Sequence, residues 1–369
     1  MRFILTTLLL FCYSIGFSCY NEYHALDAQG HFHQMEVGEI RFQTNFDMRR
    51  IEKQLLKLGQ KLQTKADFKL LSDYGLYLVK AGKVKEALVL FEALAKAYPN
   101  EYSIIANLGT TYELSGNNEK ALEYIRKGLK LNPNSHAGSE WIHVKLLLAK
   151  IELAKNPDYL TKNTILNLTP QQEASETIRK QLYIQLQERF PFCKGPDPIM
   201  ADLFIDLGDC YVSTISFEHA KGLYQIAKLY YKTERTDVDE KIEQVRKLRA
   251  KYANLQPDET TTAAREHGMV SKISGIPYTS FLRDPNSDHY SVNWSKIETD
   301  PGKLLALIGL SPVEDETPKA KESKPEPESK PKDKTVKPVK KTNPSTLWIS
   351  LGMVAFIIAI FTYFRTKRK

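Results

Sequence analysis

Residues 74–91 read "YGLYLVKAGKVKEALVLF", and residues 108–125 read "LGTTYELSGNNEKALEYI". Both stretches carry the same small and turn-forming residues, and the second copy is offset from the first by thirty-four positions. The matched positions are Gly75 with Gly109, Gly82 with Gly116, Ala87 with Ala121, and Pro99 with Pro133. A period of this length is typical of a helix–turn–helix unit that buries its apolar face by stacking on copies of itself. The sequence therefore predicts two stacked helical hairpins, near residues 68–101 and 102–135.

The repeated residues have physical roles in such a hairpin. A glycine within the first helix, Gly75 or Gly109, lets the second helix approach closely. Gly82 and Gly116 suit the turn between the helices, where a positive φ is easily adopted only by glycine. Each unit ends at a proline, because proline cannot continue a helix. Large residues are expected to fill the contact between the helices: Leu71, Tyr74, Leu78, Leu88, Phe91, Leu94, Ile105, Leu108, Tyr112, Leu122, Ile125 and Leu129.

These two segments resemble tetratricopeptide repeats. A third copy, near residues 201–234, is less regular, because Ile215 stands at the position of the turn glycine and no proline closes the unit. Its matching residues are Leu207, Gly208, Tyr211, Ala220, Tyr224 and Ala227. The resemblance implies an all-α solenoid, and it implies a non-enzymatic scaffold that mediates protein–protein interaction.

Apolar residues at helical spacing also predict helices outside the three copies. The predicted segments are 46–65, 139–155, 169–190 and 237–255. The first and last are expected to close the ends of a solenoid that spans residues 46–255, after an N-terminal extension at 19–45. An ordinary helical bundle is the alternative, but a bundle does not explain four matched pairs at one offset.

The first helices are expected to line a groove for a protein or peptide partner, because the first helix of each unit faces the concave side in arrays of this type. The candidate positions are Lys69, Ser72, Asp73, Leu76, Lys80, Ser103, Ala106, Asn107, Thr110, Glu113, Asp202, Asp206 and Asp209. The three aspartates of the third copy share one helical face, and their mutual repulsion favours a basic partner. A solvated outer face is the alternative interpretation of these aspartates.

Some tetratricopeptide repeat proteins grip the acidic C-terminus of a partner with a lysine and an asparagine on the first helix of the first repeat. In this chain those two positions hold Ser72 and Leu76, although Asn107 fits its place in the second repeat. We therefore do not predict that a C-terminal carboxylate is the ligand.

The two ends of the chain predict a membrane protein. Residues 1–18 have the basic start, the apolar run and the small final residues of a secretory signal peptide. Residues 347–364 read "LWISLGMVAFIIAIFTYF", and as a helix this uncharged segment is about 27 Å long, which is close to the hydrocarbon thickness of a bilayer. The basic residues 365–369 follow it and predict a cytoplasmic tail.

These segments together predict a single-pass protein whose body lies outside the cytoplasm. A bacterial host with the body in the periplasm is the first interpretation. Two N-glycosylation motifs, at Asn167 and Asn293, leave a eukaryotic secretory route open.

Two segments lie between the solenoid and the transmembrane helix. Residues 312–346 are rich in Pro, Lys and Glu and are predicted to be a disordered tether. Residues 256–311 are irregular but contain isolated aromatic residues, so they either pack back along the solenoid as a strap or fold on binding. The net charge of +8 lies mainly in the signal, the tether and the tail, which leaves about +1 for the folded body. We therefore expect no nucleic-acid partner.

Three cysteines remain after removal of the signal. Cys19 would be the first residue of the mature chain, and a resemblance to bacterial lipoprotein signals makes it a candidate for lipidation, although Gly16 replaces the Leu-like residue of those signals. Cys193 and Cys210 are candidates for a disulfide outside the cytoplasm. The alternative is that Cys210 is a small buried thiol in the core of the third repeat.

The sequence contains no pattern that predicts catalysis: no nucleophile elbow, no phosphate-binding glycine loop and no HExxH motif. His24, His31 and His33 are weak candidates for metal binding, because alternate residues of an extended segment share a face. We expect no enzyme activity and no cofactor. The predicted function is a membrane-tethered scaffold, and the alternatives are a metal- or cofactor-handling accessory protein and a cell-wall- or glycan-binding protein.

Overall fold

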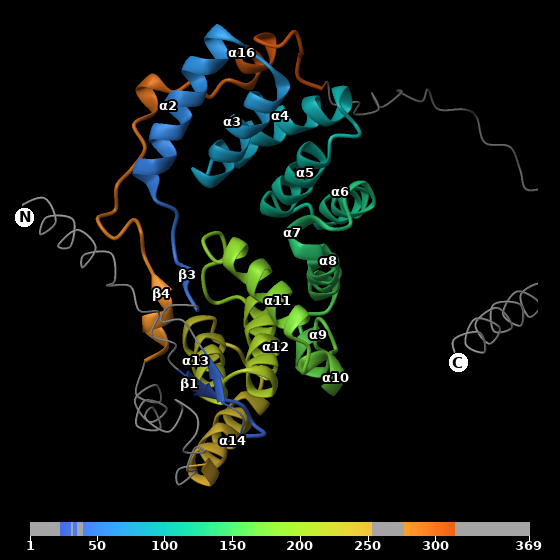
Figure 1. The fold of residues 1–369 in the computed structure, drawn as a ribbon. Coiled ribbons are helices and arrows are strands. Elements are labelled where there is room, and N and C mark those ends of the chain that lie inside the picture. Colours follow the sequence, from blue (N-terminus) through green and yellow to red (C-terminus); the bar gives the residue numbers. More distant parts are fainter. Residues whose placement is uncertain (1–22, 31, 35–39, 253–276, 314–369) are drawn as a thin grey trace, which may run out of the picture. The chain divides into compact units, whose positions relative to one another are not determined.

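The computed structural model describes residues 23–30, 32–34, 40–252 and 277–313. All described residues belong to one compact unit of the chain. The helices from α2 to α14 pack mainly against helices that are near them in the sequence. Figure 1 shows them in chain order. The longer helices are α2 (Met48–Thr64), α3 (Phe68–Lys80), α4 (Val84–Ala97), α5 (Tyr102–Leu114), α6 (Asn118–Leu131), α8 (Glu140–Lys155), α11 (Glu176–Arg189), α12 (Pro198–Thr214), α13 (Phe217–Gln225) and α14 (Asp237–Tyr252).

The two repeats quoted from the sequence form the hairpins α3/α4 and α5/α6, as predicted. A Cβ atom on Gly75 would lie 3.0 Å from Cζ of Phe91, and one on Gly109 would lie 2.7 Å from Cδ1 of Ile125. The missing side chains therefore permit the close approach of the second helix. The turn glycines Gly82 and Gly116 have φ of 85° and 88°, which confirms their predicted conformation.

A third hairpin, α12/α13, lies where the irregular third copy was predicted. A Cβ atom on Gly208 would lie 2.3 Å from Cε1 of Tyr224. The large residue follows its glycine by sixteen positions in all three hairpins (91 − 75, 125 − 109 and 224 − 208). At the turn, Ile215 has an ordinary φ of −150°, and the Ser216 side chain caps the next helix by accepting a hydrogen bond from the backbone N–H of His219. This turn therefore needs no glycine.

The segment 169–190, predicted as one helix, is divided into α10 (Pro170–Glu173) and α11. Thr169 caps the first of these helices, and Ser175 caps the second by accepting a hydrogen bond from the backbone N–H of Ile178. The second cap starts a new helix and explains the interruption. Short helices α7 (Ser135–Gly138) and α9 (Tyr159–Lys162) join the longer ones, and a π-helical turn, η1 (Ile226–Tyr230), continues α13.

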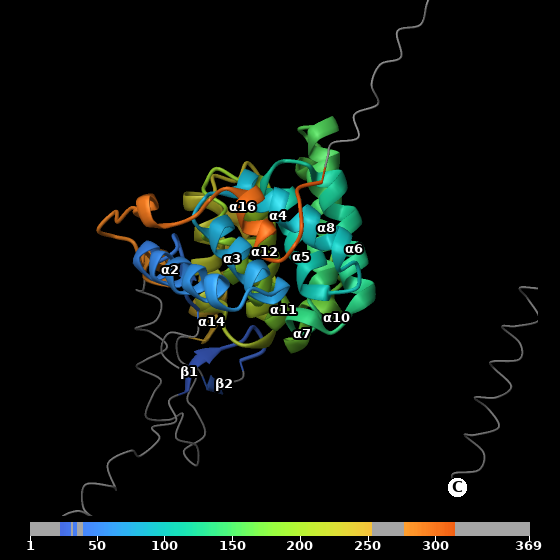
Figure 2. The same ribbon diagram turned by 90° about the horizontal axis from the view of Figure 1, so that it is seen from above.

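Residues 277–313, here called the strap, pack back along the solenoid, as one of the two interpretations of this region proposed. They contain the 3₁₀ helices η3 (Tyr278–Phe281) and η4 (Trp294–Lys296) and the short helix α16 (Pro301–Ala306). The Phe281 ring occupies the space that a side chain on Gly222 of α13 would need. Farther along, the Tyr74 hydroxyl of α3 donates a 2.7 Å hydrogen bond to the carbonyl of Glu298. Figure 2 shows α16 beside α4.

Two small sheets depart from the predicted all-α fold. Strand β3 (Phe42–Gln43) pairs in parallel with β4 (Leu282–Arg283) of the strap. Strands β1 (Tyr23–Leu26) and β2 (Phe32–Gln34) form an antiparallel pair. The parallel pair joins segments 282 − 42 = 240 residues apart, which local sequence patterns do not reveal.

Several predictions fall outside the described residues: the signal peptide at 1–18, lipidation of Cys19, most of the tether at 312–346, the transmembrane helix at 347–364 and the tail at 365–369. Among the helices that the structure does describe, none combines the length and the apolar character needed to cross a bilayer.

Candidate functional site

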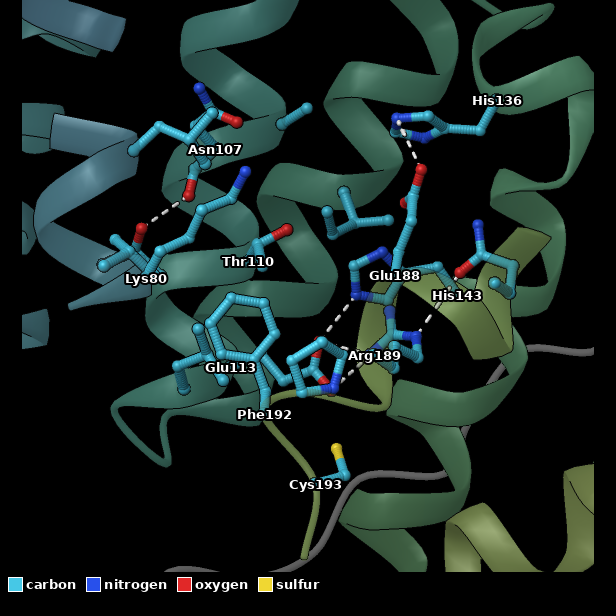
Figure 3. A pocket seen from close by; sticks show the side chains of 18 of the residues that line it. Lys80, Asn107, Thr110, Glu113, His136, His143, Glu188, Arg189, Phe192 and Cys193 are labelled. Carbon is cyan, nitrogen blue, oxygen red and sulfur yellow. Dashed lines mark hydrogen bonds and ion pairs between the residues drawn. The ribbon is translucent and has the colours of Figure 1, made fainter. Parts of the chain in front are cut away.

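A pocket of about 390 Å³ lies between the first helices of the two regular repeats and the later helices α8 and α11 (Figure 3). From the predicted groove positions, it is lined by Leu76, Lys80, Ala106, Asn107, Thr110 and Glu113. Facing them are residues of α8, of α11 and of the segment 191–193 that follows α11. The repeats therefore contribute one side of the pocket, and helices outside the regular repeats contribute the other.

Glu113 of α5 is the centre of a buried ionic network. Its side chain is only 3% exposed, and its two carboxylate oxygens lie 2.9 and 3.1 Å from Nη1 of Arg189. Oε2 also lies 2.7 Å from Nε2 of His143, and Oε1 accepts a 2.7 Å hydrogen bond from Lys150. Burial alone would raise the pKa of Glu113, but Arg189, His143 and Lys150 outweigh it and hold the pKa well below its ordinary value. Its carboxylate is thus fully engaged inside the protein.

A second carboxylate extends this network. Glu140 of α8 bonds Nδ1 of His136, and its Oε2 lies 3.5 Å from Nδ1 of His143. Burial opposes ionisation of Glu140, but the two histidines more than compensate and lower its pKa to about 2. His143 therefore bridges two carboxylates and links α5 with α8, while Arg189 adds α11. The polar groups at this end of the pocket hold one another in fixed positions.

The side of the pocket formed by α3 and α5 has different chemistry. Within the described chain, the side chains of Lys80, Asn107 and Thr110 make no hydrogen bond and no ion pair. The Lys80 ammonium lies 5.4 Å from the ring centre of Tyr77 and 5.9 Å from that of Phe46. Burial, assisted by the charge of Arg50, lowers the pKa of Lys80. These three side chains are available to a bound molecule.

The other predicted groove residues lie elsewhere. Lys69 and Asp73 are exposed on α3 but do not line the pocket. The three aspartates of α12 were predicted to share an acidic face of the groove, but Arg235, which precedes α14, pairs with Asp202, and Lys241 of α14 pairs with Asp209. Asp202 is 1% exposed, accepts a 2.7 Å hydrogen bond from the backbone N–H of Ile165 and pairs with Arg235. This part of the prediction therefore needs correction, because Asp202 is enclosed in the protein.

Asp206 and Asp209 are also engaged or enclosed. Both oxygens of Asp209 lie 2.8 Å from Nζ of Lys241, and Oδ1 accepts a 2.7 Å hydrogen bond from the Tyr224 hydroxyl. Asp206 is 6% exposed, and its Oδ2 has no hydrogen-bond partner within the described residues. Burial, with the nearby charges of Asp202 and Asp209, raises the pKa of Asp206 well above its ordinary value. The reason given for expecting a basic partner is therefore absent from the structure.

The structure contains Cys193 and Cys210 as free thiols, so no disulfide joins them. Cys210 is buried in α12, in agreement with the alternative of a small core residue. Cys193 lines the pocket, and burial raises the pKa of its thiol to about 11. A thiol with this pKa is protonated at neutral pH and is a weak nucleophile.

The histidines proposed as metal ligands lie at the N-terminal hairpin. In the backbone pairing of β1 with β2, His33 is opposite Ala25, while His31 and the side chains of His24 and His33 lie outside what the structure describes. Among the described residues, no group of three or more His, Cys, Asp or Glu side chains is arranged to hold a metal ion.

The sequence reasoning missed the far side of the pocket, formed by Glu140, His143, Lys150, Glu188 and Arg189. One signal was present. His143 and Lys150 are seven residues apart, which places both on one face of α8, and Glu113 is an acid on a helix that was expected to pack tightly. Two basic side chains on one face of a helix and an acid on another helix are compatible with an ionic contact, but the sequence places Glu113 in the groove and does not show that these helices meet.

Residues 78–155 match the family model described as Tetratricopeptide repeat. This part of the chain is therefore similar to tetratricopeptide repeats. The matched segment begins within α3 and ends with α8, so it includes the α5/α6 hairpin and the pocket residues of α5 and α8.

Among curated proteins, the chain is similar to the protein named Protein CTR9 homolog from Arabidopsis thaliana, with 42% identity over 55 residues. The similar region covers 15% of this chain and only 5% of that relative. No solved structure matches the chain. The family match concerns residues 78–155, and the chain spans only a small part of the curated relative.

Proposed function

We propose that this protein is a membrane-tethered scaffold that binds a segment of a partner protein in the pocket between α3, α5 and α11. The observation that carries the proposal is the set of polar side chains on the inner helices of the two regular repeats that make no hydrogen bond or ion pair with the described residues, next to a rigid ionic network. Tetratricopeptide repeats commonly mediate protein–protein interaction, and the pocket has the mixture of apolar and polar lining that a peptide requires.

The tethering part of the proposal comes from the ends of the chain. The signal-like residues 1–18, the apolar residues 347–364 and the basic residues 365–369 support a body that is exported and an end that remains in the membrane. The polar tether at 312–346 then leaves the body free to meet partners near the bilayer. In a bacterium this places the body in the periplasm.

Site-specific photo-crosslinking tests the binding surface. A photoreactive residue replaces Thr110, which lines the pocket, or Glu123, which is exposed on α6 and does not line it. After illumination of intact cells, the expected result is a discrete crosslinked partner from position 110 and none from position 123. Equal crosslinking from both positions, or none from position 110, would contradict the assignment of the pocket.

Protease protection in sealed spheroplasts tests the tether separately. Protease added outside is expected to degrade the body and to spare an epitope placed after Lys369. Degradation of the epitope with protection of the body would reverse the proposed topology, and it would not affect the assignment of the pocket.

A further inference from the structure

The polar groups at the two sides of the pocket differ in how well they are satisfied. His143 and Arg189 each bond the Glu113 carboxylate, at distances of 2.7 to 3.1 Å. On the other side, Lys80 and Asn107 have side chains without hydrogen bonds or ion pairs in the described part of the chain. Figure 3 shows Lys80, Asn107 and Thr110 together along one side of the cavity. A ligand therefore finds its free polar contacts on that side.

Lys80 brings a positive charge that forms no ion pair among the described residues. Its ammonium group is partly buried beside the rings of Phe46 and Tyr77, where water solvates it less well than at an open surface. Glu188 also lines the pocket, and its charge opposes the effect of burial on the pKa of Lys80, but it lies 3.7 Å from Nε2 of His136 and forms no ion pair with Lys80. The Lys80 charge is therefore stabilised most by an anion that enters with the ligand.

The neighbouring groups suit a carboxylate. Asn107 and Thr110 are three residues apart on α5, so their side chains share a helical face. The ammonium group, the amide and the hydroxyl are all hydrogen-bond donors, and a carboxylate has two oxygens that each accept more than one hydrogen bond. The apolar residues Leu76 and Phe192 line the same cavity and favour apolar neighbours on the ligand.

We propose that the Lys80 side of the pocket binds the carboxylate of an Asp or Glu side chain in the partner segment. Lys80 supplies the charge, while Asn107 and Thr110 donate the accompanying hydrogen bonds. This inference rests on the proposed function and names the chemistry of the partner. It reverses the sequence-based expectation of a basic partner, because the aspartates behind that expectation are enclosed by Arg235, Lys241 and the α12/α13 hairpin.

Synthetic peptide pools test the proposal with the full-length chain in detergent. Each pool consists of capped octapeptides with one fixed central residue, either Glu, Gln or Lys, among randomised apolar and small residues. Binding is measured by fluorescence anisotropy. The expected order is Glu over Gln by about tenfold, with Lys weakest, because a charge-assisted hydrogen bond in a partly buried site is worth about one order of magnitude in affinity.

Two lysine variants test whether Lys80 is responsible for the preference for the Glu pool. Lys80→Met is expected to reduce binding of the Glu pool to the level of the Gln pool, while Lys69→Met, at an exposed lysine of the same helix outside the pocket, should leave it unchanged. Circular dichroism melting checks that both variants fold. Equal binding of the Glu and Gln pools, equal effects of the two variants, or binding of no pool would overturn the proposal.

The photo-crosslinking experiment distinguishes failure of the carboxylate proposal from failure of the proposed binding function. A partner crosslinked at position 110, together with no preference for the Glu pool, would retain the binding pocket and reject the acidic side chain. Loss of crosslinking at position 110 would reject both.

Discussion

The hairpins α5/α6 and α12/α13 are built around the same contact, yet their inner helices have different surroundings. In both, a glycine of the first helix receives a large residue located sixteen positions later. The inner face of α5 borders a pocket, whereas the acidic face of α12 is covered by Arg235 and Lys241. The repeat pattern therefore determines how two helices pack, but distant segments determine whether their inner face is open to a ligand.

The buried acids of the two hairpins show the same difference. Glu113 on α5 is contacted by Arg189, His143 and Lys150, which hold its pKa low. Asp206 on α12 lies near Arg235 and Lys241, but those cations bond Asp202 and Asp209 instead, and the pKa of Asp206 is raised. One acid stabilises the fold in its charged form, and the other is accommodated best in its protonated form.

The largest effect is expected for Glu113→Gln. This change leaves the positive charges of Arg189 and Lys150 without their carboxylate, and removing one partner of a buried ion pair typically costs about 3–5 kcal/mol. Urea denaturation measures the loss in the free energy of unfolding. Glu123→Gln on the exposed face of α6 is the control, and its effect should stay within about 0.5 kcal/mol. Similar losses for the two variants would show that the ionic network around Glu113 does not stabilise the folded protein.

A smaller effect is expected for Gly208→Ala, which tests the contact shared by the hairpins. The new Cβ would lie 2.3 Å from the Tyr224 ring, and a hydrogen bond to Asp209 holds that ring in place. Overpacking of this kind costs about 1–3 kcal/mol. At Gly75 the nearest atom is 3.0 Å away, and alanine gains about 1 kcal/mol of helix propensity, so Gly75→Ala should have little net effect. Thermal melting of both variants measures the difference, and a greater loss at position 75 would be inconsistent with these contacts.

Asp206→Asn should increase the free energy of unfolding at neutral pH. Because the folded-state pKa of Asp206 is raised, the unfolded chain releases its proton first as pH increases, and the folded state is progressively disfavoured above a pH of about 4. Each pKa unit of that difference is worth about 1.4 kcal/mol once the pH exceeds both values. The gain in unfolding free energy should therefore be greater at pH 7 than at pH 4.

Asp209→Asn is the matched control for this experiment, because both oxygens of Asp209 lie 2.8 Å from Nζ of Lys241 and Oδ1 accepts a hydrogen bond from the Tyr224 hydroxyl. Its substitution should destabilise the protein at neutral pH. A variant of Asp206 that is less stable than the natural chain at pH 7 would show that Asp206 is charged and paired in the folded state.

The sequence predicted the local part of this structure. Gly75, Gly82 and their repeats predicted two hairpins and their turns, because those positions depend on residues within one unit. The sequence also placed Lys80 and Asn107 on the inner helices. The hairpins follow from the repeated positions in the sequence, and the inner positions of Lys80 and Asn107 follow from the resemblance to stacked helical arrays.

The features of the fold and the pocket that the sequence did not predict depend on contacts between segments that are distant in the chain. Arg189 reaches Glu113 from seventy-six residues away, and Phe281 of the strap fills the space at Gly222. The helix α14 was predicted as an end cap, but its sequence does not show that Lys241 would meet Asp209. Pairing of charges over such separations is decided by tertiary packing, and one sequence does not specify the partner of a given charge.

The open inner face of the first two hairpins and the closed inner face of the third can be compared directly by the acylation of two lysines. Lys80 lines the pocket without an ion pair in the described chain, and Lys241 is bound by both oxygens of Asp209 with 23% of its side chain exposed. Limited treatment of the folded full-length chain with an amine-reactive ester, followed by peptide mass spectrometry, measures both rates in one sample. Faster modification of Lys80 than of Lys241 is the expected result. Equal rates, or faster modification of Lys241, would contradict the proposal that the α3/α5 side holds an available cation.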